Sequence, residues 1–377
     1  MSRPTVVIHV GLPKTGTTYL QDRLWRNRDT ALRVGGLLYP GVEMSDHFHA
    51  AVHLQPDRYL DWVDPAHADA WGRMVAQMRG WPGTSLVSHE LFSTATAEQA
   101  RRVVADLDFA DVHVVATVRD LARQLPSVWQ ENVKNQHTST LDEFIESLRR
   151  DPIERQEPFW EFQDFVRILR TWGDGLPSDR IHLVTVPRSG SGPSASLWDR
   201  FTSVLGVDGA ELDVPVPPSN AALTPPQVEL LRALNTHLQP DTVAWDRYEW
   251  AVKRHLIGDI LFDTVDRHGR SLTVDQSWWA AERSDAMIAA VVDAGFDIVG
   301  DTDDLRVDSV TGTDDDVDAT GEPTPEETLE VAVAALARIL ATMPMPARHR
   351  GVRSRVGAVV RGGRRRAAAL ALRRRAR

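Results

Sequence analysis

The sequence predicts an α/β protein with a parallel β-sheet flanked by helices in three layers, followed by a mostly helical C-terminal portion. Two observations carry this prediction. Short apolar runs rich in β-branched residues occupy 5–11, 84–88, 112–118 and 181–186. Stretches with helical spacing of apolar residues separate these runs. Strands that alternate with helices form a parallel sheet covered on both faces, and such sheets bind ligands beyond the carboxyl ends of their strands.

Each element follows from its local pattern. The run TVVIHVG at 5–11 ends in glycine, as a buried strand before a turn does. A helix is expected over 17–27, where Leu20, Leu24 and the ring of Trp25 share a face. The strand at 112–118 precedes a second helix at 121–133. After a flexible loop at 188–196, residues 197–296 are expected to be mostly helical.

Composition excludes several classes of protein. The 377 residues carry 43 lysines and arginines against 53 acids, a net charge of −10, which argues against a protein that is basic overall and against a specific nucleic-acid partner. With no cysteine, the chain has no disulfide, thiol chemistry or cysteine-ligated metal. No apolar run approaches the roughly 20 residues of a membrane-spanning helix. We expect a cytoplasmic protein.

The C-terminal charges divide the chain. We expect one domain over 1–300 and an acidic, disordered linker over 301–323, in which residues 301–322 carry nine acids and one arginine. A capping box predicts a helix over 324–343, and a basic tail follows over 344–377. Residues 348–377 hold 12 arginines and no acid, so the net charge of the preceding residues is −22. Such a tail could contact an anionic membrane surface at the inner face, touch nucleic acid, fold back on the acidic linker, or stay solvated.

A glycine-bearing loop joins the first strand to the first helix. Its sequence, GLPKTGTT at 11–18, places backbone N–H groups at a helix N-terminus, where a phosphate binds. Gly11 and Gly16 have the spacing of the nucleotide-hydrolase P-loop, but Thr17 stands in place of the lysine of that motif. The lysine lies at position 14 instead. It is one of only three lysines in the chain, which uses arginine at every other basic position.

This loop, as P-K-T-G-T-T, resembles the phosphosulfate-binding loop of sulfotransferases that use 3′-phosphoadenosine 5′-phosphosulfate (PAPS) as co-substrate. The resemblance implies that Lys14 contacts the oxygen that bridges phosphate and sulfuryl group. The loop residues implied to bind the co-substrate are Pro13, Lys14, Thr15, Gly16, Thr17 and Thr18. The motifs cover about 5–190 and are most similar to the bacterial branch, because the Arg-Lys-Gly element of the animal cytosolic branch has no clear counterpart.

The same family binds the 3′-phosphate with an arginine at a strand end and a serine eight residues later. Arg119 ends the strand at 112–118, and Ser127 follows at that spacing. A guanidinium offers a fork of donors that suits a phosphate, and a hydroxyl two helical turns on can add another. Arg123 is a further candidate contact. The alternative is that Arg119 and Asp120 form a solvated ion pair.

Ser88-His89-Glu90 ends the strand at 84–88 and supplies the candidate base. Sulfuryl transfer to an alcohol requires removal of the hydroxyl proton, which a carboxylate or an imidazole can accept. The resemblance to a Ser-x-Glu strand end favours Glu90, with His89 second. Adjacent residues of a strand end point to opposite sides, so one of the two is expected to face the reacting group. The alternative is a capping glutamate beside a surface histidine.

Two further readings concern metals and rival functions. His49 and His53 lie one helical turn apart, but sulfuryl transfer needs no metal, and we expect none. With His47, these histidines could instead line an acceptor site for a small-molecule, carbohydrate or lipid hydroxyl. The rival functions are a nucleotide kinase or NTPase on the same fold, and a nucleotide-binding scaffold without enzymatic activity.

Overall fold

The computed structural model describes residues 3–150, 158–188, 196–216, 223–261, 270–307 and 322–343. In this part of the chain, a parallel six-stranded sheet has the order β2-β3-β1-β4-β5-β6. The strands are β1 (Thr5–His9), β2 (Leu37–Leu38), β3 (Thr84–Ser88), β4 (Asp111–Val118), β5 (Ile181–Thr185) and β6 (Asp297–Val299). The predicted α/β fold with a parallel sheet between helices is confirmed.

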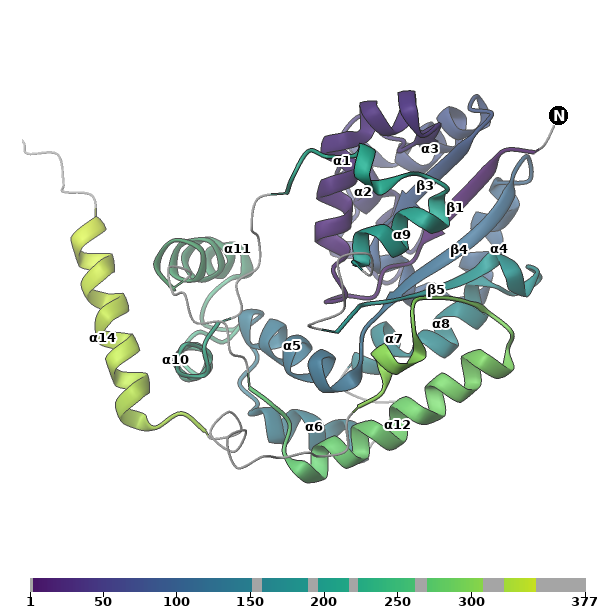
Figure 1. Cartoon of the computed structure of the whole chain (residues 1–377). Helices are drawn as coiled ribbons and strands as arrows, with labels where there is room; N and C mark the ends of the chain where they lie inside the picture. The colour runs from purple at the N-terminus through teal and green to yellow at the C-terminus, as the bar shows by residue number, and fades with distance from the viewer. Residues whose placement is uncertain are drawn as a thin grey trace, which may run out of the picture. The chain divides into compact units, whose positions relative to one another are not determined.

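Helices α1 (Thr17–Val34) and α9 (Leu197–Leu205) cover one face of the sheet (Figure 1). Their apolar side chains form a buried cluster with one residue from each of β1, β3, β4 and β5. This cluster includes Leu20, Leu24, Trp198, Phe201, Val7, Leu86, Val115 and Val184. The adjacent strand residues, such as Val6 and Val114, are also buried, so the sheet is covered on both faces.

On the other face, α8 (Phe165–Trp172) packs against β4 and contacts α4 (Ala97–Asp106) and α12 (Val274–Asp293). Trp172 is buried there, and its indole N–H donates to the carbonyl of Phe92 at 2.9 Å. Helix α5 (Leu121–Lys134) lies beside α10 (Pro225–Asn235) and α6 (Leu141–Arg150).

The register brings three strand ends together. His9, the last residue of β1, pairs with Ser88 at the end of β3 and with Val115 of β4. Strand β4 then continues to Val118, directly before Arg119. The segments that follow β1, β3 and β4 therefore emerge at one edge of the sheet, which is where ligands bind in parallel sheets.

The remaining elements include helices that lie away from the sheet, such as α11 (Trp245–Tyr248) beside α10 (Figure 1). The others are α2 (Asp46–His53), α3 (Ala70–Arg79), α7 (Phe159–Gln163), the wide-turned helix η7 (Glu249–Leu261) and short 3₁₀ turns that include η3 (Glu90–Thr94). The expectation that 197–296 is mostly helical is confirmed. Strands β2 and β6, with two and three residues, were not predicted because such short edge strands carry no recognisable pattern.

The C-terminal segments depart partly from the expected boundaries. The chain divides into two compact units, residues 1–331 and 332–377. Residues 301–307 belong to the folded part, because Asp304 is buried and accepts a hydrogen bond from the Thr185 hydroxyl at 2.9 Å. The rest of the predicted linker up to residue 321, and the tail from 344, lie outside the described residues.

The predicted C-terminal helix is present as α14 (Pro325–Thr342). Its capping box is formed as expected: the Glu327 N–H donates to the Thr324 hydroxyl, and a Glu327 carboxylate oxygen accepts from the Thr324 N–H. None of the helices in the described ranges combines the length and the apolar composition that crossing a bilayer requires.

Candidate functional site

The glycine loop, residues 11–16, connects β1 to α1. Positive φ angles occur at Gly11 (73°), Lys14 (71°) and Gly16 (94°). Gly16 caps α1 without a side-chain hydrogen bond, and the backbone N–H groups of residues 15–19 donate to no residue that the structure describes. Left-handed residues interspersed in a loop before a helix N-terminus form a concave set of N–H donors. Such donors, together with the helix dipole, are suited to bind an anion.

The threonines of the loop region have different roles. The Thr15 side chain is buried, and its hydroxyl donates to the Leu12 carbonyl at 2.7 Å. This hydrogen bond stabilises the conformation of the loop. The Thr17 hydroxyl also donates to Leu12, at 3.1 Å, although Thr17 lines the cavity described below. Thr18 is exposed and lines the cavity. The Thr15 and Thr17 hydroxyls are thus both bound to the loop itself, and of the three threonines only Thr15 does not line the cavity.

A buried polar network ties the strand ends together beneath the glycine loop. His9 Nδ1 lies 2.8 Å from the Ser88 hydroxyl, and its Nε2 lies 3.3 Å from the Thr117 hydroxyl. Gln21 donates to the Ser88 carbonyl at 3.1 Å. Burial, with a contribution from the charge on His89, lowers the pKa of His9 to about 3, so this imidazole is neutral at pH 7. The network holds β1, β3 and β4 in register at the edge where the loop begins.

Arg119 and Ser127 both line the same cavity as the glycine loop. Arg119 forms no hydrogen bond or ion pair with the described residues, and burial and then the neighbouring Arg123 lower its pKa to about 10. A half-buried guanidinium at pH 7 without a partner is a site that an anion can complete.

The alternative pairing of Arg119 with Asp120 is not formed. Asp120 is buried, caps α5 by accepting from the Arg123 N–H at 2.9 Å, and forms its ion pair with the Arg123 guanidinium. Arg123 also donates to the Pro187 carbonyl at 3.1 Å. Arg123 lines the cavity but is thereby held by protein groups, so its role as a further phosphate contact is less well supported than that of Arg119.

Glu90 and His89 point to different surroundings. Glu90 lines the cavity, and its carboxylate forms no hydrogen bond or ion pair with the described residues. His89 does not line the cavity. Its Nδ1 accepts from the Leu91 N–H at 3.1 Å, its ring packs 5.6 Å from the ring of Phe48, and burial lowers its pKa. Of the two candidate bases, the geometry therefore favours Glu90.

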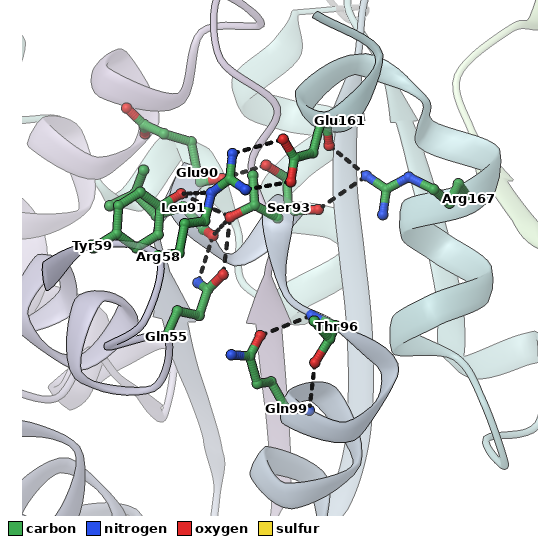
Figure 2. Close-up of polar contacts among 11 residues, drawn as sticks. Gln55, Arg58, Tyr59, Glu90, Leu91, Ser93, Thr96, Gln99, Glu161 and Arg167 are labelled. Atoms are coloured by element: carbon green, nitrogen blue, oxygen red, sulfur yellow. Dashed lines mark hydrogen bonds and ion pairs between the residues drawn. The ribbon is translucent and has the colours of Figure 1, made fainter. Parts of the chain in front are cut away.

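The segment that follows Glu90 is held by a dense set of hydrogen bonds (Figure 2). The Ser93 hydroxyl donates to the Glu90 carbonyl at 2.6 Å, and Gln55 donates to the Leu91 carbonyl at 2.8 Å. Arg58 and Glu161 form a two-pronged ion pair beside it. None of the contacts drawn in Figure 2 involves the Glu90 carboxylate, so the backbone of Glu90 is fixed while its side chain is left available.

Glu131, a carboxylate that the sequence did not single out, lines the cavity and lies among three lysines. Lys14 Nζ donates to Glu131 Oε2 at 3.2 Å. Lys134 and Lys253 lie 4.0 and 3.9 Å from the same carboxylate. Burial raises the pKa of Glu131, but Lys14 and the other two lysines lower it to a net value below the ordinary range. This cluster was not predicted from the sequence, because its members come from the glycine loop, α5 and η7, which are far apart along the chain.

The cavity has a volume of ≈ 890 Å³, within the range of ligand sites and large enough for a nucleotide beside a second reactant. Its lining includes Pro13, Lys14, Gly16, Thr17, Thr18, Glu90, Arg119, Ser127, Glu131 and Lys134. Apart from Thr15 and His89, it brings together all residues predicted for catalysis and co-substrate binding.

The three clustered histidines lie elsewhere. His47 is buried, stacks on Tyr39 and bonds the Pro40 carbonyl at 3.0 Å, and the Ser88 N–H donates to its other ring nitrogen at 3.3 Å. His49 stacks on a histidine of a neighbouring turn and His53 bonds a backbone carbonyl. Within the described ranges, no three histidine or acidic side chains lie together as a metal site requires. The histidines do not line the cavity, so the expected acceptor role is not supported.

Comparison with known protein families finds no family model that matches this chain, and comparison with curated proteins finds no significant match.

Proposed function

We propose that this protein is a sulfotransferase that transfers the sulfuryl group of PAPS to an acceptor hydroxyl. One observation carries the proposal: a single cavity collects the N–H groups of the glycine loop, Lys14, Arg119, Ser127 and the carboxylate of Glu90. Among the described residues, the N–H groups of 15–19, Arg119 and the Glu90 carboxylate have no hydrogen-bond or ion-pair partner. The groups required to bind two anionic ends of a nucleotide and to accept one proton therefore face the same space.

The residues present fit PAPS as co-substrate. The glycine loop and Lys14 would hold the 5′-phosphosulfate, with Lys14 stabilising the charge that develops on the departing 5′-phosphate oxygen. Arg119 and Ser127 would hold the 3′-phosphate, which distinguishes PAPS from nucleotides that lack this group. The half-buried guanidinium of Arg119, which has no partner in the part of the chain that the structure describes, is the observation that supports an anion at this position.

Glu90 would accept the acceptor's proton. As the acceptor oxygen forms its bond to sulfur, the bond from sulfur to the 5′-phosphate oxygen breaks, and 3′,5′-adenosine bisphosphate (PAP) leaves with the electron pair. The hydroxyl proton passes to the Glu90 carboxylate, which is within the cavity and has no competing partner among the described residues. No metal is required for this transfer.

The test is incubation of metabolite extracts with the enzyme and radiolabelled PAPS, followed by mass spectrometry for products that gained a sulfuryl group. We expect sulfated product with the native chain and none with Lys14→Ala or Arg119→Ala. Arg102→Ala, which removes a positive charge from an exposed position on α4, is the matched control. Unchanged turnover in both active-site variants would overturn the assignment.

Calorimetry separates the rival functions. Thr17 stands where the lysine of nucleotide hydrolases belongs, so we expect PAP to bind more tightly than ATP. Tighter binding of ATP, with hydrolysis, would favour a kinase or NTPase. Tight binding of PAP without any sulfated product from a broad set of hydroxyl acceptors would favour a scaffold.

The proposal includes a location. We place the enzyme in the cytoplasm, with the tail at residues 348–377 in contact with an anionic membrane surface at its inner face. The 12 arginines of that segment and its lack of acids support this contact.

A further inference from the structure

All three lysines of the chain lie around one carboxylate. The chain uses arginine at 40 of its 43 basic positions, yet Lys14, Lys134 and Lys253 each lie within 4.0 Å of Glu131. They come from the glycine loop, from the last turn of α5 and from η7, so chain proximity explains only the contact with Lys134. A cluster built from three separate segments around a cavity calls for an explanation beyond surface charge balance.

Lysine rather than arginine at these three positions indicates that at least one of the contacts with Glu131 has to be broken and re-formed. An arginine presents a rigid planar fork, which suits a fixed pair such as Arg123 with Asp120. A lysine presents a compact charge on a flexible stem, which can rotate from one anion to another. Lys14 lines the cavity and also contacts Glu131, and 28% of its side chain is exposed.

The other two lysines keep Glu131 satisfied. The Glu131 side chain is 35% exposed, and a partly buried carboxylate that loses its only partner destabilises a fold. Lys253 is itself anchored, since it donates to the Asn135 side chain at 2.7 Å and lies 5.4 Å from the Trp245 ring. Lys134 is the most buried of the three, with 12% of its side chain exposed. If Lys14 leaves, Glu131 still has two cations within reach.

We propose that Glu131 is a positioning residue that holds the Lys14 ammonium while the glycine loop is free of anion and yields it to an anion that binds there. Lys134 and Lys253 remain beside the Glu131 carboxylate, so the transfer of Lys14 from Glu131 to the bound anion does not leave this carboxylate without a cation. Glu131 thus competes with the bound anion for Lys14 and sets the affinity of the loop. The inference deepens the proposed function, on which it rests for the identity of the anion.

The test is a double-mutant cycle on anion affinity, measured by calorimetry with PAP and with inorganic pyrophosphate. Glu131→Gln keeps the shape of the side chain and removes the charge that holds Lys14. We expect it to tighten binding of both probes about three- to tenfold, as for release of a partly exposed ion pair. In the Lys14→Ala background, the same substitution should change the affinity less than twofold (about the error of such cycles).

The cycle distinguishes the proposal from general electrostatics. Removal of any nearby negative charge raises anion affinity, but that effect would persist without Lys14. Equal tightening in both backgrounds would therefore overturn the proposal, as would no tightening at all in the native background. Glu229→Gln, which removes a carboxylate paired with Arg232 on α10, is the charge-matched control and should leave both affinities unchanged. Thermal unfolding of each variant establishes that it is folded.

A kinetic readout adds a second criterion. Glu131→Gln should lower KM for PAPS, and Glu131→Asp, which restores a carboxylate on a shorter stem, should return KM toward the native value. If pyrophosphate shows the cycle but no sulfated product forms in any assay, the exchange stands and the sulfotransferase assignment fails. If product forms and the cycle is absent, the assignment stands and the role of Glu131 fails.

Discussion

Gly11 and Glu90 are in backbone contact: a Cβ atom built on Gly11 would lie 2.5 Å from the Cα and 2.8 Å from the Cβ of Glu90. The start of the glycine loop and the end of β3 thus approach each other more closely than any side chain at position 11 would permit. Gly11 also has a φ of 73°, which L-residues rarely adopt. This contact fixes the distance between the glycine loop and the proposed base.

We expect Gly11→Ala to separate the loop from Glu90. The strained φ alone costs about 1 kcal/mol, and the clash adds to it. Chemical denaturation should show a loss of about 2–3 kcal/mol of unfolding free energy, and calorimetry should show weaker binding of PAP. Gly175→Ala is the matched control, because Gly175 has a φ of 81° but no atom within 4 Å of its built Cβ. A loss no larger than that of the control would show that the contact is unimportant.

The sequence predicted those parts of the candidate site whose residues lie close together along the chain. The glycine loop, Arg119 with Ser127, and the strand end before Glu90 are each contained in a dozen residues, and periodicity located their strands and helices. The cavity brings these three segments together because parallel strands end at one edge.

The sequence was not informative where partners are distant along the chain. Glu131 lies 117 residues from Lys14, and within α5 it reads as an ordinary surface glutamate. The buried imidazole of His9 likewise reads as part of an apolar strand, and its partner hydroxyls come from two other strands. Such contacts depend on the tertiary fold and leave no local pattern, although the scarcity of lysine was a signal that pointed to Lys14 and could have been extended to Lys134 and Lys253.

Arg119 should set the preference for a 3′-phosphate. Arg119→Met removes the charge and keeps much of the apolar stem, so we expect PAP to bind about 10- to 100-fold more weakly, the value of a charge-assisted hydrogen bond or two. Adenosine 5′-monophosphate, which lacks the 3′-phosphate, should lose much less. The comparison of both nucleotides by calorimetry is the measurement, with the exposed Arg102→Met as charge control. Equal losses for both nucleotides would show that Arg119 does not contact this phosphate.

Glu90 and His89 can be separated by their kinetics. Glu90→Gln should lower kcat by about 10²- to 10⁴-fold, the usual contribution of a general base, and should change PAP affinity little. His89→Asn retains an acceptor for the Leu91 N–H, and we expect a much smaller loss because His89 does not line the cavity. Steady-state rates of product formation from PAPS and a hydroxyl acceptor that the native enzyme sulfates provide the measurement. The reverse order of effects would assign the base to His89.

Helix α14 presents an apolar stripe that favours membrane contact. Four apolar residues recur at helical spacing, and each of them is more than half exposed: Leu329, Val333, Leu336 and Leu340. The arginine-rich segment at 348–377 follows this helix in the sequence, and its charge complements anionic lipid. We propose that this end of the chain binds an anionic bilayer surface.

Vesicle sedimentation tests this contact. The full chain should bind vesicles that contain phosphatidylserine and release them at high salt, whereas vesicles of phosphatidylcholine alone should bind weakly. A chain that ends at residue 347 should lose most of this binding, and Leu336→Asp should weaken it. Equal binding by the full and shortened chains would contradict the proposal. Concentration-dependent dimers that Leu336→Asp abolishes would instead assign the stripe to self-association.

Two buried histidines should make the fold sensitive to acid. Burial, with the charge on His89 adding to it, lowers the pKa values of His9 and His47 from 6.5 to about 3. Between about pH 3 and pH 6.5, His9 and His47 therefore each bind a proton in the unfolded chain but not in the folded protein. The free energy of unfolding should therefore be unaffected by these groups at pH 8 and fall as the pH drops below 6.5, by about 1.4 kcal/mol per pH unit for each histidine.

Chemical denaturation at pH 7.0, 6.0 and 5.0 measures this slope. His9→Gln is neutral in both states, so we expect its stability to be lower at pH 7, through loss of the bonds to Ser88 and Thr117, but its slope below pH 6.5 to be shallower by about one proton. The exposed His237→Gln serves as the matched control and should keep the native slope. The native slope in His9→Gln would show that His9 is protonated in the folded protein. The network that holds the ends of β1, β3 and β4 beneath the glycine loop would then contain a buried positive charge. The two hydroxyl partners of His9 carry no negative charge that could balance it.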